Sequence, residues 1–303
     1  MRVIVLDDLH RVIVLGEGQI GSAIARSLIG SGTVSEYRPT FRTDWSTPAT
    51  AGESTSAALA EVEALGDGRT TVVWAAGTAG MTTSKQRCEQ NLETMISAVG
   101  AALESAGPGG KSRVHLIGSA GAHATGRPRW AGANALVSSD GTRSNDVPYV
   151  WLKLAEEDWV ASLVDVDSIV HRVSSVYSRP NDPGRSGMIA ALIRNAARGE
   201  VTTIYGGWST LRNYVHADDV GDYVARTVRY GGPATTLLAD RRSYAITELV
   251  SLVSRYLRRP VPLRMAAGSN SEHHSFDPGA ISNGFTTRPL ATAIRQILLD
   301  SGP

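Results

Sequence analysis

Apolar residues occur in two spacings along this chain, and these spacings predict alternating strands and helices. Short runs rich in apolar residues, typical of buried strands, lie at residues 12–15, 70–74, 114–117 and 168–173. Apolar residues that recur every three or four positions predict helices after Gly21 and over residues 57–65, 85–103 and 149–163. The Ser-, Thr-, Gly- and Ala-rich stretch 46–56 is expected to be a loop. This alternation predicts an α/β fold built on a doubly wound parallel sheet.

The start of the chain contains the same apolar run twice, as RVIVL at 2–6 and again at 11–15. Only the second copy runs into glycines, so we expect it to be the first core strand. The role of residues 1–10 stays open between a disordered extension, an extra edge strand and the result of a mis-set start site. The next core strand is expected within 34–41, where Pro39 disturbs the strand pattern.

The sequence GEGQIG at 16–21 joins this core strand to a helix. A strand, a glycine-rich turn and a helix in this order are typical of sites for the pyrophosphate of a dinucleotide. Gly16 permits the tight turn, Gly18 lets the backbone approach the phosphates, and Gly21 lets the helix pack close to the strand. The free N–H groups and the positive dipole end of that helix face the anion. The small residues at 75–77 would let a flat cofactor lie against the end of a neighbouring strand.

Composition and charge narrow the classes of function. An apolar content of 42% in 303 residues fits a packed globular protein, and a net charge of +1 gives no argument for nucleic acid or a membrane surface as partner. The single cysteine, Cys88, excludes a disulfide framework and a cysteine metal cluster. No metal site is expected, because the adjacent His273 and His274 lack the spacing of a helical metal pair. We expect a cytoplasmic protein, since no signal peptide and no membrane-spanning stretch are recognised.

Three residues suggest acid–base chemistry at one oxygen atom. Tyr149 and Lys153 are four residues apart on a predicted helix, so both side chains lie on one face. An ammonium lowers the pKa of a nearby phenol, which makes it a better proton donor and acceptor near neutral pH. Ser119, at the end of a strand, could donate a hydrogen bond to the same substrate oxygen. A helix-surface Tyr and Lys is the alternative, but the glycine turn upstream favours catalysis with a nicotinamide cofactor.

The identity of that cofactor depends on the segment after the second strand. Sites for NAD usually have an acid there, roughly 20 residues beyond the glycines, that binds the ribose hydroxyls. This chain has Arg38, Arg42 and Asp44 in that segment. An arginine suits the 2′-phosphate, so NADP (as NADPH) is favoured with Arg42 as its contact. Two solvated surface arginines, with NAD as the cofactor, are the alternative.

The motifs occur in the order found in a known family. With the glycine turn come IGSAGAHATG (117–126), YVWLK (149–153), HRVSSVYSRP (171–180) and TIYGGWSTLRNYVHADDV (203–220). Over residues 11 to about 300 the chain resembles the extended short-chain dehydrogenase/reductase family, the NAD-dependent epimerase/dehydratase group that acts on nucleotide-linked sugars. Its glycine motif is one residue shorter than the GxxGxxG usual in the family.

The resemblance implies an architecture. It implies a Rossmann-type dinucleotide-binding domain over 11–180 and about 213–243. It also implies a smaller substrate-binding domain over about 181–212 and 244–303. A homodimer that takes a nucleotide sugar as its substrate is the implied assembly.

The resemblance also implies roles for single residues. It gives the catalytic roles to Ser119, Tyr149 and Lys153, and Lys153 would also hold the nicotinamide ribose. The positions expected to contact the cofactor are Gly16, Gly18, Gln19, Ile20, Gly21, Arg42, Ala75, Ala76, Gly77, Lys153 and Val173. The positions expected to contact the substrate are Arg212, which would bind the nucleotide diphosphate, Ser175, which replaces an asparagine, and His123, which replaces a tyrosine.

Departures from the family pattern narrow the reaction. Ala120 and Gly121 stand where 4,6-dehydratases of the family have an Asp-Glu pair, which argues against dehydration. We expect C4-ketoreduction of a dTDP-4-keto-6-deoxyhexose, because an exchanging NADPH suits a reductase. A nucleotide-sugar 4-epimerase with tightly held NAD is the alternative. A non-catalytic dinucleotide-binding regulator is a third hypothesis, and the intact set Ser119, Tyr149 and Lys153 argues against it.

Overall fold

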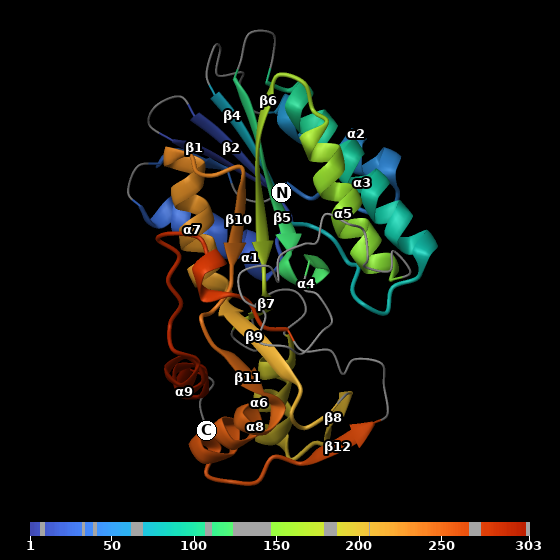
Figure 1. Cartoon of the computed structure of the whole chain (residues 1–303). Coiled ribbons are helices and arrows are strands. Elements are labelled where there is room, and N and C mark those ends of the chain that lie inside the picture. Colours follow the sequence, from blue (N-terminus) through green and yellow to red (C-terminus); the bar gives the residue numbers. More distant parts are fainter. Residues whose placement is uncertain are drawn as a thin grey trace.

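A central sheet with helices on both faces forms the upper part of the molecule, and a smaller lobe lies beyond one end of its strands (Figure 1). The computed structural model describes residues 1–6, 10–31, 34–38, 41–61, 69–106, 111–123, 147–178, 187–205, 207–266 and 274–300. The lobe lies where the arrows of β5 and β6 end in Figure 1, so it faces the carboxyl ends of the strands.

The central sheet has the order β10-β6-β5-β4-β2-β1-β3 among the described residues. Its strands are β1 (Arg2–Leu6), β2 (His10–Leu15), β3 (Val34–Arg38), β4 (Arg69–Trp74), β5 (Ser112–Ser119), β6 (Val166–Val173) and β10 (Thr235–Leu238). From β10 to β2, each strand is parallel to its neighbour. The predicted doubly wound sheet is confirmed and is mainly parallel, and the four predicted apolar runs form β2, β4, β5 and β6.

The first copy of the RVIVL repeat forms β1, which lies inside the sheet. It is antiparallel to both β2 and β3 and separates them. Of the three interpretations of residues 1–10, the extra strand therefore describes residues 2–6, but at an internal position. The reason lies in the alternation of side chains along the strand: Val3 packs in the cluster with Trp74, whereas Ile4 packs in the opposite cluster with Tyr223. An all-apolar run of this kind must be covered on both faces.

Helices cover the two faces of the sheet. On one face lie α1 (Gln19–Gly30) and α7 (Ala217–Tyr230), and on the other lie α2 (Pro48–Ala60), α3 (Lys85–Glu104) and α5 (Pro148–Ala161) (Figure 1). The α1–α7 pair is very close, because a Cβ added at Gly221 would lie 2.6 Å from the backbone carbonyl carbon of Ala23. Any side chain at Gly221 would push α7 away from α1.

The loop expected over 46–56 is wrong, because α2 begins at Pro48. Thr47 caps this helix: its hydroxyl accepts from the Thr50 N–H at 3.1 Å, and the Thr50 hydroxyl accepts from the Thr47 N–H at 3.1 Å. Proline is favoured in a first helical turn, and reciprocal capping satisfies backbone groups that would otherwise lack partners. The helix expected over 57–65 overlaps the last four residues of α2, and residues 62–68 lie outside the described part.

In its described residues, the smaller lobe has two short sheets, three helices and a hydrophobic core of its own. Its elements are β7 (Ser175–Tyr177), α6 (Gly187–Arg198), β8 (Thr202–Tyr205), β9 (Leu211–His216), β11 (Ser243–Ala245), α8 (Ile246–Leu257), β12 (Leu263–Ala266) and α9 (Leu290–Asp300). The turns α4 (Ala120–His123) and η1 (Pro278–Ala280) complete the described elements. Because β7 follows β6 after one residue, the lobe is joined directly to the carboxyl end of the central sheet.

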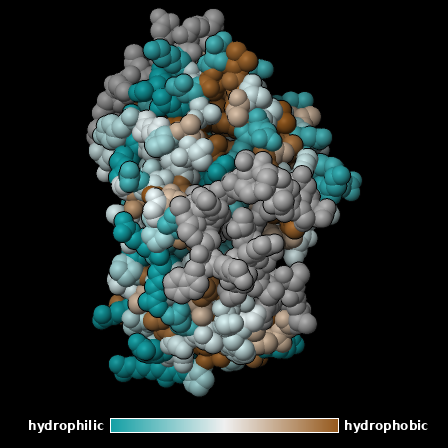
Figure 2. Space-filling model, viewed as in Figure 1, coloured by the Kyte–Doolittle hydropathy of each residue, from teal (hydrophilic) through white to brown (hydrophobic). Residues whose placement is uncertain are grey.

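The surface is mixed in character. Figure 2 shows hydrophilic residues along much of the visible face, with hydrophobic residues between them. In the part of the chain that the structure describes, none of the helices has the length and apolar character needed to cross a membrane.

Candidate active site

The glycine turn at 16–21 joins β2 to α1 and packs directly on the end of β4. Gly16 has φ +110°, and a Cβ there would lie 2.6 Å from the backbone of Ala75; a Cβ at Gly21 would lie 2.0 Å from the carbonyl oxygen of Gly16. Both positions therefore require glycine. At Gly18 nothing lies within 4 Å of an added Cβ, and this residue precedes α1 without capping it through a side chain. Open space over uncapped N–H groups fits a dinucleotide pyrophosphate.

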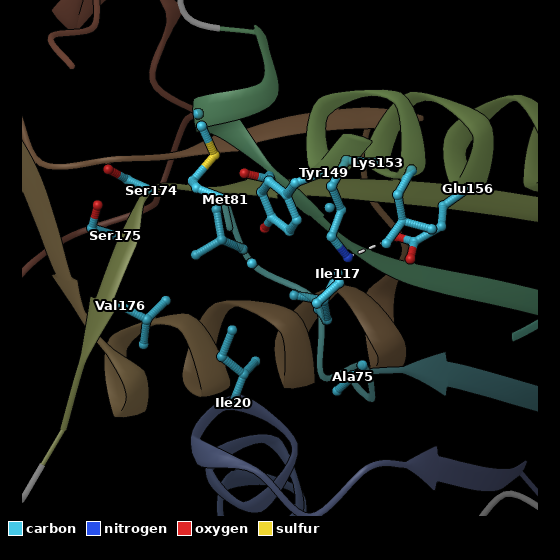
Figure 3. A pocket seen from close by; sticks show the side chains of 18 of the residues that line it. Ile20, Ala75, Met81, Ile117, Tyr149, Lys153, Glu156, Ser174, Ser175 and Val176 are labelled. Carbon is cyan, nitrogen blue, oxygen red and sulfur yellow. Dashed lines mark hydrogen bonds and ion pairs between the residues drawn. The ribbon is translucent and has the colours of Figure 1, made fainter. Parts of the chain in front are cut away.

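A cavity of about 390 Å³ lies beside this turn, and all three predicted catalytic residues line it. Ser119 ends β5, while Tyr149 and Lys153 point into the cavity from the first turns of α5 (Figure 3). Pro148 favours this helix start because its fixed φ suits the first turn. The cavity is also lined by several positions predicted to contact the cofactor or the substrate, namely Ile20, Ala75, Ala76, Gly77, Val173 and Ser175.

A second cavity of about 370 Å³ adjoins the first, and both are lined by residues 75–77 and Asn91. Gly16 and Gly18 line this second cavity, together with Trp45. Trp45 meets Trp74 edge to face, with ring centroids 5.8 Å apart. The two cavities thus lie on either side of the strand end at residues 75–77, as the two halves of a dinucleotide require. The first, next to Tyr149, suits the nicotinamide half, and the second suits the adenosine half.

A buried ion pair fixes the lysine of the catalytic set. Lys153 Nζ donates to Glu156 Oε2 at 2.8 Å, and the two side chains are 11% and 2% exposed. Burial alone would lower the pKa of Lys153, but Glu156, Tyr149 and Glu157 together outweigh it and the pKa is raised. Burial raises the pKa of Glu156, against the pull of the ammonium. The lysine therefore stays protonated in the buried site.

The tyrosine lies close to this charged pair. Lys153 Nζ is 5.9 Å from the centroid of the Tyr149 ring, and both residues face the same cavity (Figure 3). The ammonium and the phenol are thus presented together to one ligand position. A substrate oxygen between Ser119 and Tyr149 could therefore accept a hydrogen bond from one hydroxyl and a proton from the other.

Other predicted site residues lie outside this cavity. His123 is buried on α4, where its Nε2 lies 2.8 Å from Glu157 Oε1, and Glu157 also accepts from Arg172 Nη2 at 2.7 Å. These partners lower the pKa of Glu157 although burial opposes the shift. Arg212 is 9% exposed on β9 and donates to the carbonyl of Leu211 at 3.0 Å.

The remaining cofactor positions lie near the turn. Gln19 and Gly21 are in the first turn of α1, and Arg42 is exposed beyond β3. Among the described residues, neither they nor Arg212 line the two cavities. The side chain of Arg38 and residue His273 lie outside the described part.

Sequence reasoning missed two titratable residues of the cavity, Glu156 and His274. Glu156 had a usable signal, because it follows Lys153 by three residues and lies on the same helix face. His274 had none, since it comes from a loop far along the chain. A Cβ added at Gly121 would lie 3.4 Å from His274 Cε1 and 3.5 Å from Ser119 Oγ. The imidazole and the Ser119 hydroxyl thus both lie next to Gly121, and a larger residue at 121 would disturb both.

Comparisons with known proteins agree with this geometry. The model of the NAD dependent epimerase/dehydratase family matches residues 12–236. A UDP-glucose 4-epimerase of Mycolicibacterium smegmatis is 36% identical over 91 residues, which cover 29% of this chain and 28% of that protein. The match thus spans less than a third of that relative's length.

Two solved structures have the same fold over almost their whole length. The UDP-glucose 4-epimerase of Thermus thermophilus in complex with NAD is 18% identical and covers 95% of this chain and 97% of its own, with a TM-score of 0.76. RMD from Pseudomonas aeruginosa, complexed with NADPH, is 16% identical over 95% of this chain and 97% of its own, with a TM-score of 0.70.

The family model covers most of the chain, and within it lie the glycine turn, the strand-end serine and the Tyr–Lys pair of the cavity. The sheet has the Rossmann-type arrangement of the solved structures. The protein therefore belongs to the NAD-dependent epimerase/dehydratase family and is a nicotinamide-dependent enzyme of the short-chain dehydrogenase/reductase type.

Proposed function

We propose that this enzyme reduces the C4 ketone of a nucleotide-linked 4-keto-6-deoxyhexose, with dTDP as the nucleotide and NADPH as the hydride donor. The observation behind the proposal is the convergence of Ser119, Tyr149 and Lys153 in one cavity next to the glycine turn. These residues fit a nicotinamide cofactor, because the turn leaves uncapped N–H groups beside open space. When bound, the cofactor supplies the hydride for the ketone carbon.

The side chains would handle the proton. The Ser119 hydroxyl donates a hydrogen bond to the ketone oxygen and orients it. Tyr149 transfers its hydroxyl proton to that oxygen as the carbon gains the hydride, which yields the alcohol. Lys153 stabilises the phenolate left on Tyr149, since opposite charges at short distance attract strongly in a buried site. In this proposal Arg212 and Ser175 contact the nucleotide diphosphate and the sugar, and two copies of the chain form a dimer.

The relatives named UDP-glucose 4-epimerase favour a second candidate, a 4-epimerase. An epimerase would use the same three side chains, but it would take the hydride from the sugar and return it to the opposite face. The two activities differ in their demand for cofactor. A reductase consumes one reduced cofactor per product, whereas an epimerase consumes none.

The deciding experiment incubates the purified protein with dTDP-4-keto-6-deoxyglucose and NADPH. Loss of the reduced-nicotinamide absorbance in proportion to product, identified by mass spectrometry, would support the reductase. A parallel incubation with UDP-glucose and no added cofactor tests the epimerase. Conversion there, without oxidation of NADPH by the keto sugar, would contradict the proposed reduction.

A further inference from the structure

The glycine turn follows β2. The strand that neighbours β2 in the sheet is not β3, which is the next strand along the chain. In doubly wound sheets, the residue that recognises the adenosine ribose lies at the carboxyl end of the strand that follows the first helix. Here β1 lies beside β2, and β3 is one strand further out. Because β1 is antiparallel to β2, its first residues lie at the end of β2 that carries the glycine turn. Arg2 is paired with Val14, next to the last residue of β2.

The side chain of Arg2 contacts the glycine turn itself. Its Nε donates to Oε1 of Glu17, the second residue of the turn, at 3.3 Å. The Arg2 and Glu17 side chains are 23% and 36% exposed; Glu17 lines the second cavity, and Arg2 lies behind it, outside that lining. Within the described chain, the two terminal nitrogens of Arg2 donate to no other side chain. The guanidinium is thus held at the turn with donors to spare.

The segment after β3 lies on the outer side of β1. The Phe41 N–H donates to the carbonyl of Met1 at 2.9 Å, so this segment continues the pairing with β1 rather than with β2. Arg42 follows it and is exposed. Neighbouring strands are roughly 5 Å apart, so the backbone that leads into Arg42 is about one strand spacing further from β2 than β1 is.

We propose that Arg2 binds the 2′-phosphate of NADP and that Arg2, rather than Arg42, determines the preference between NADP and NAD. A guanidinium is a planar, permanently charged fork of donors that suits a phosphate. Glu17 holds Arg2 in position and, as a carboxylate, repels the phosphate. The inference rests on the proposed function only in taking NADP as the preferred cofactor, because both cofactors would place their ribose at this position.

The test measures dissociation constants for NADPH and NADH from nicotinamide fluorescence on binding, without substrate. Arg2→Gln should weaken the binding of NADPH by about tenfold or more, which is the scale of a charged hydrogen bond. It should weaken the binding of NADH by less than about threefold. Arg113→Gln is the matched control: Arg113 is 18% exposed and pairs with Asp167 at 3.1 Å, but near the amino ends of β5 and β6, whereas the glycine turn follows the carboxyl end of β2. Its constants should equal those of the parent protein.

Two more variants make the assignment falsifiable. Glu17→Gln should strengthen the binding of NADPH more than that of NADH, because it removes the repulsion between the carboxylate and the 2′-phosphate and keeps the shape of the side chain. Arg42→Gln should leave the ratio of the two constants unchanged. The proposal is overturned if Arg2→Gln weakens both cofactors equally or neither, or if Arg42→Gln causes the loss instead. If the parent protein reduces the sugar with NADH, the proposed NADPH dependence is contradicted. The effect of Arg2→Gln on the ratio of the NADPH and NADH dissociation constants would still test this inference.

Discussion

At the scale of single residues, the candidate site combines groups that helix geometry brings together with groups that only the fold can place. Tyr149, Lys153 and Glu156 lie on one face of α5, and all three line the same cavity. Ser119 joins them because β5 ends beside α5. Four side chains from two elements thus line one cavity.

The role of the tyrosine can be tested by removing one oxygen. Tyr149→Phe keeps the ring but removes the only proton that this side chain can transfer, so turnover should fall by about two or more orders of magnitude. Tyr230→Phe is the matched control, because Tyr230 is 82% exposed at the end of α7. Initial rates with keto sugar and NADPH measure both variants. A Tyr149→Phe rate close to that of the parent would exclude Tyr149 as the acid–base group.

The charge of Glu156 can be tested through the single cysteine. Burial raises the pKa of the Cys88 thiol, and the Glu156 carboxylate raises it further. Glu156→Gln should therefore lower the pKa of Cys88, followed as thiolate absorbance during a pH titration with the Cys88→Ser protein as baseline. Glu89→Gln is the control, since Glu89 raises this pKa least among the named charges. An equal shift in both variants would contradict a charged Glu156 beside Lys153.

At the scale of elements, β1 is the part of the fold with the largest consequence. Its side chains enter the cores on both faces of the sheet, and Ile4 is fully buried. If β1 were only an extension, the molecule would be stable without the packing of its side chains.

Truncation of one β1 side chain measures this contribution. Ile4→Ala should lower the free energy of unfolding by about 2–5 kcal/mol, the usual cost of a buried Ile-to-Ala cavity. Val164→Ala, at a position that is 82% exposed, should change it by less than about 0.5 kcal/mol. Urea unfolding followed by tryptophan fluorescence gives both values. Equal stabilities for the two variants would show that β1 does not pack in the core.

The elements also show what could be predicted from the sequence. The strands β2, β4, β5 and β6 were predictable because buried parallel strands are short apolar runs. The start of α2 was missed because its signal is the reciprocal capping by Thr47 and Thr50, and a stretch rich in Ser and Thr also has the composition of a loop. The position of β1 could not be predicted, since strand pairing is non-local and RVIVL fits any buried strand. Glu156 was within reach through helix periodicity, whereas His274 required the three-dimensional structure.

At the scale of the whole molecule, a line of buried polar side chains crosses the central sheet. His115 Nδ1 lies 3.0 Å from His171 Nε2, and His171 Nδ1 lies 2.8 Å from the Thr236 hydroxyl. Both imidazoles are fully buried and stack on one another. Burial lowers the pKa of His171 to about 3, and burial with the neighbouring imidazole lowers the pKa of His115 well below its usual value. The folded protein therefore keeps both histidines neutral.

This burial makes the stability of the fold dependent on pH. Below about pH 6.5 the unfolded chain binds protons at His115 and His171 that the folded chain excludes, so the free energy of unfolding falls as pH falls. Above that pH both states are neutral at these positions and the effect is absent. Each histidine contributes a slope of up to about 1.4 kcal/mol per pH unit. Carboxylates with a lowered pKa, such as Asp218, act only at lower pH.

Urea unfolding between about pH 5 and 6.5 separates this contribution from that of the carboxylates with a lowered pKa. His171→Gln should reduce the slope of the free energy of unfolding against pH by the contribution of about one titrating proton. This holds whatever the substitution does to the stability at neutral pH. A matched substitution of His274, which lines the cavity instead of the sheet interior, should leave the slope from the buried pair intact. A parent protein whose stability does not fall over this range would mean that the folded sheet accepts a proton at His115 or His171. The hydrogen bonds that cross β5, β6 and β10 would then have to rearrange, because a protonated imidazole has only donors to offer its neighbour.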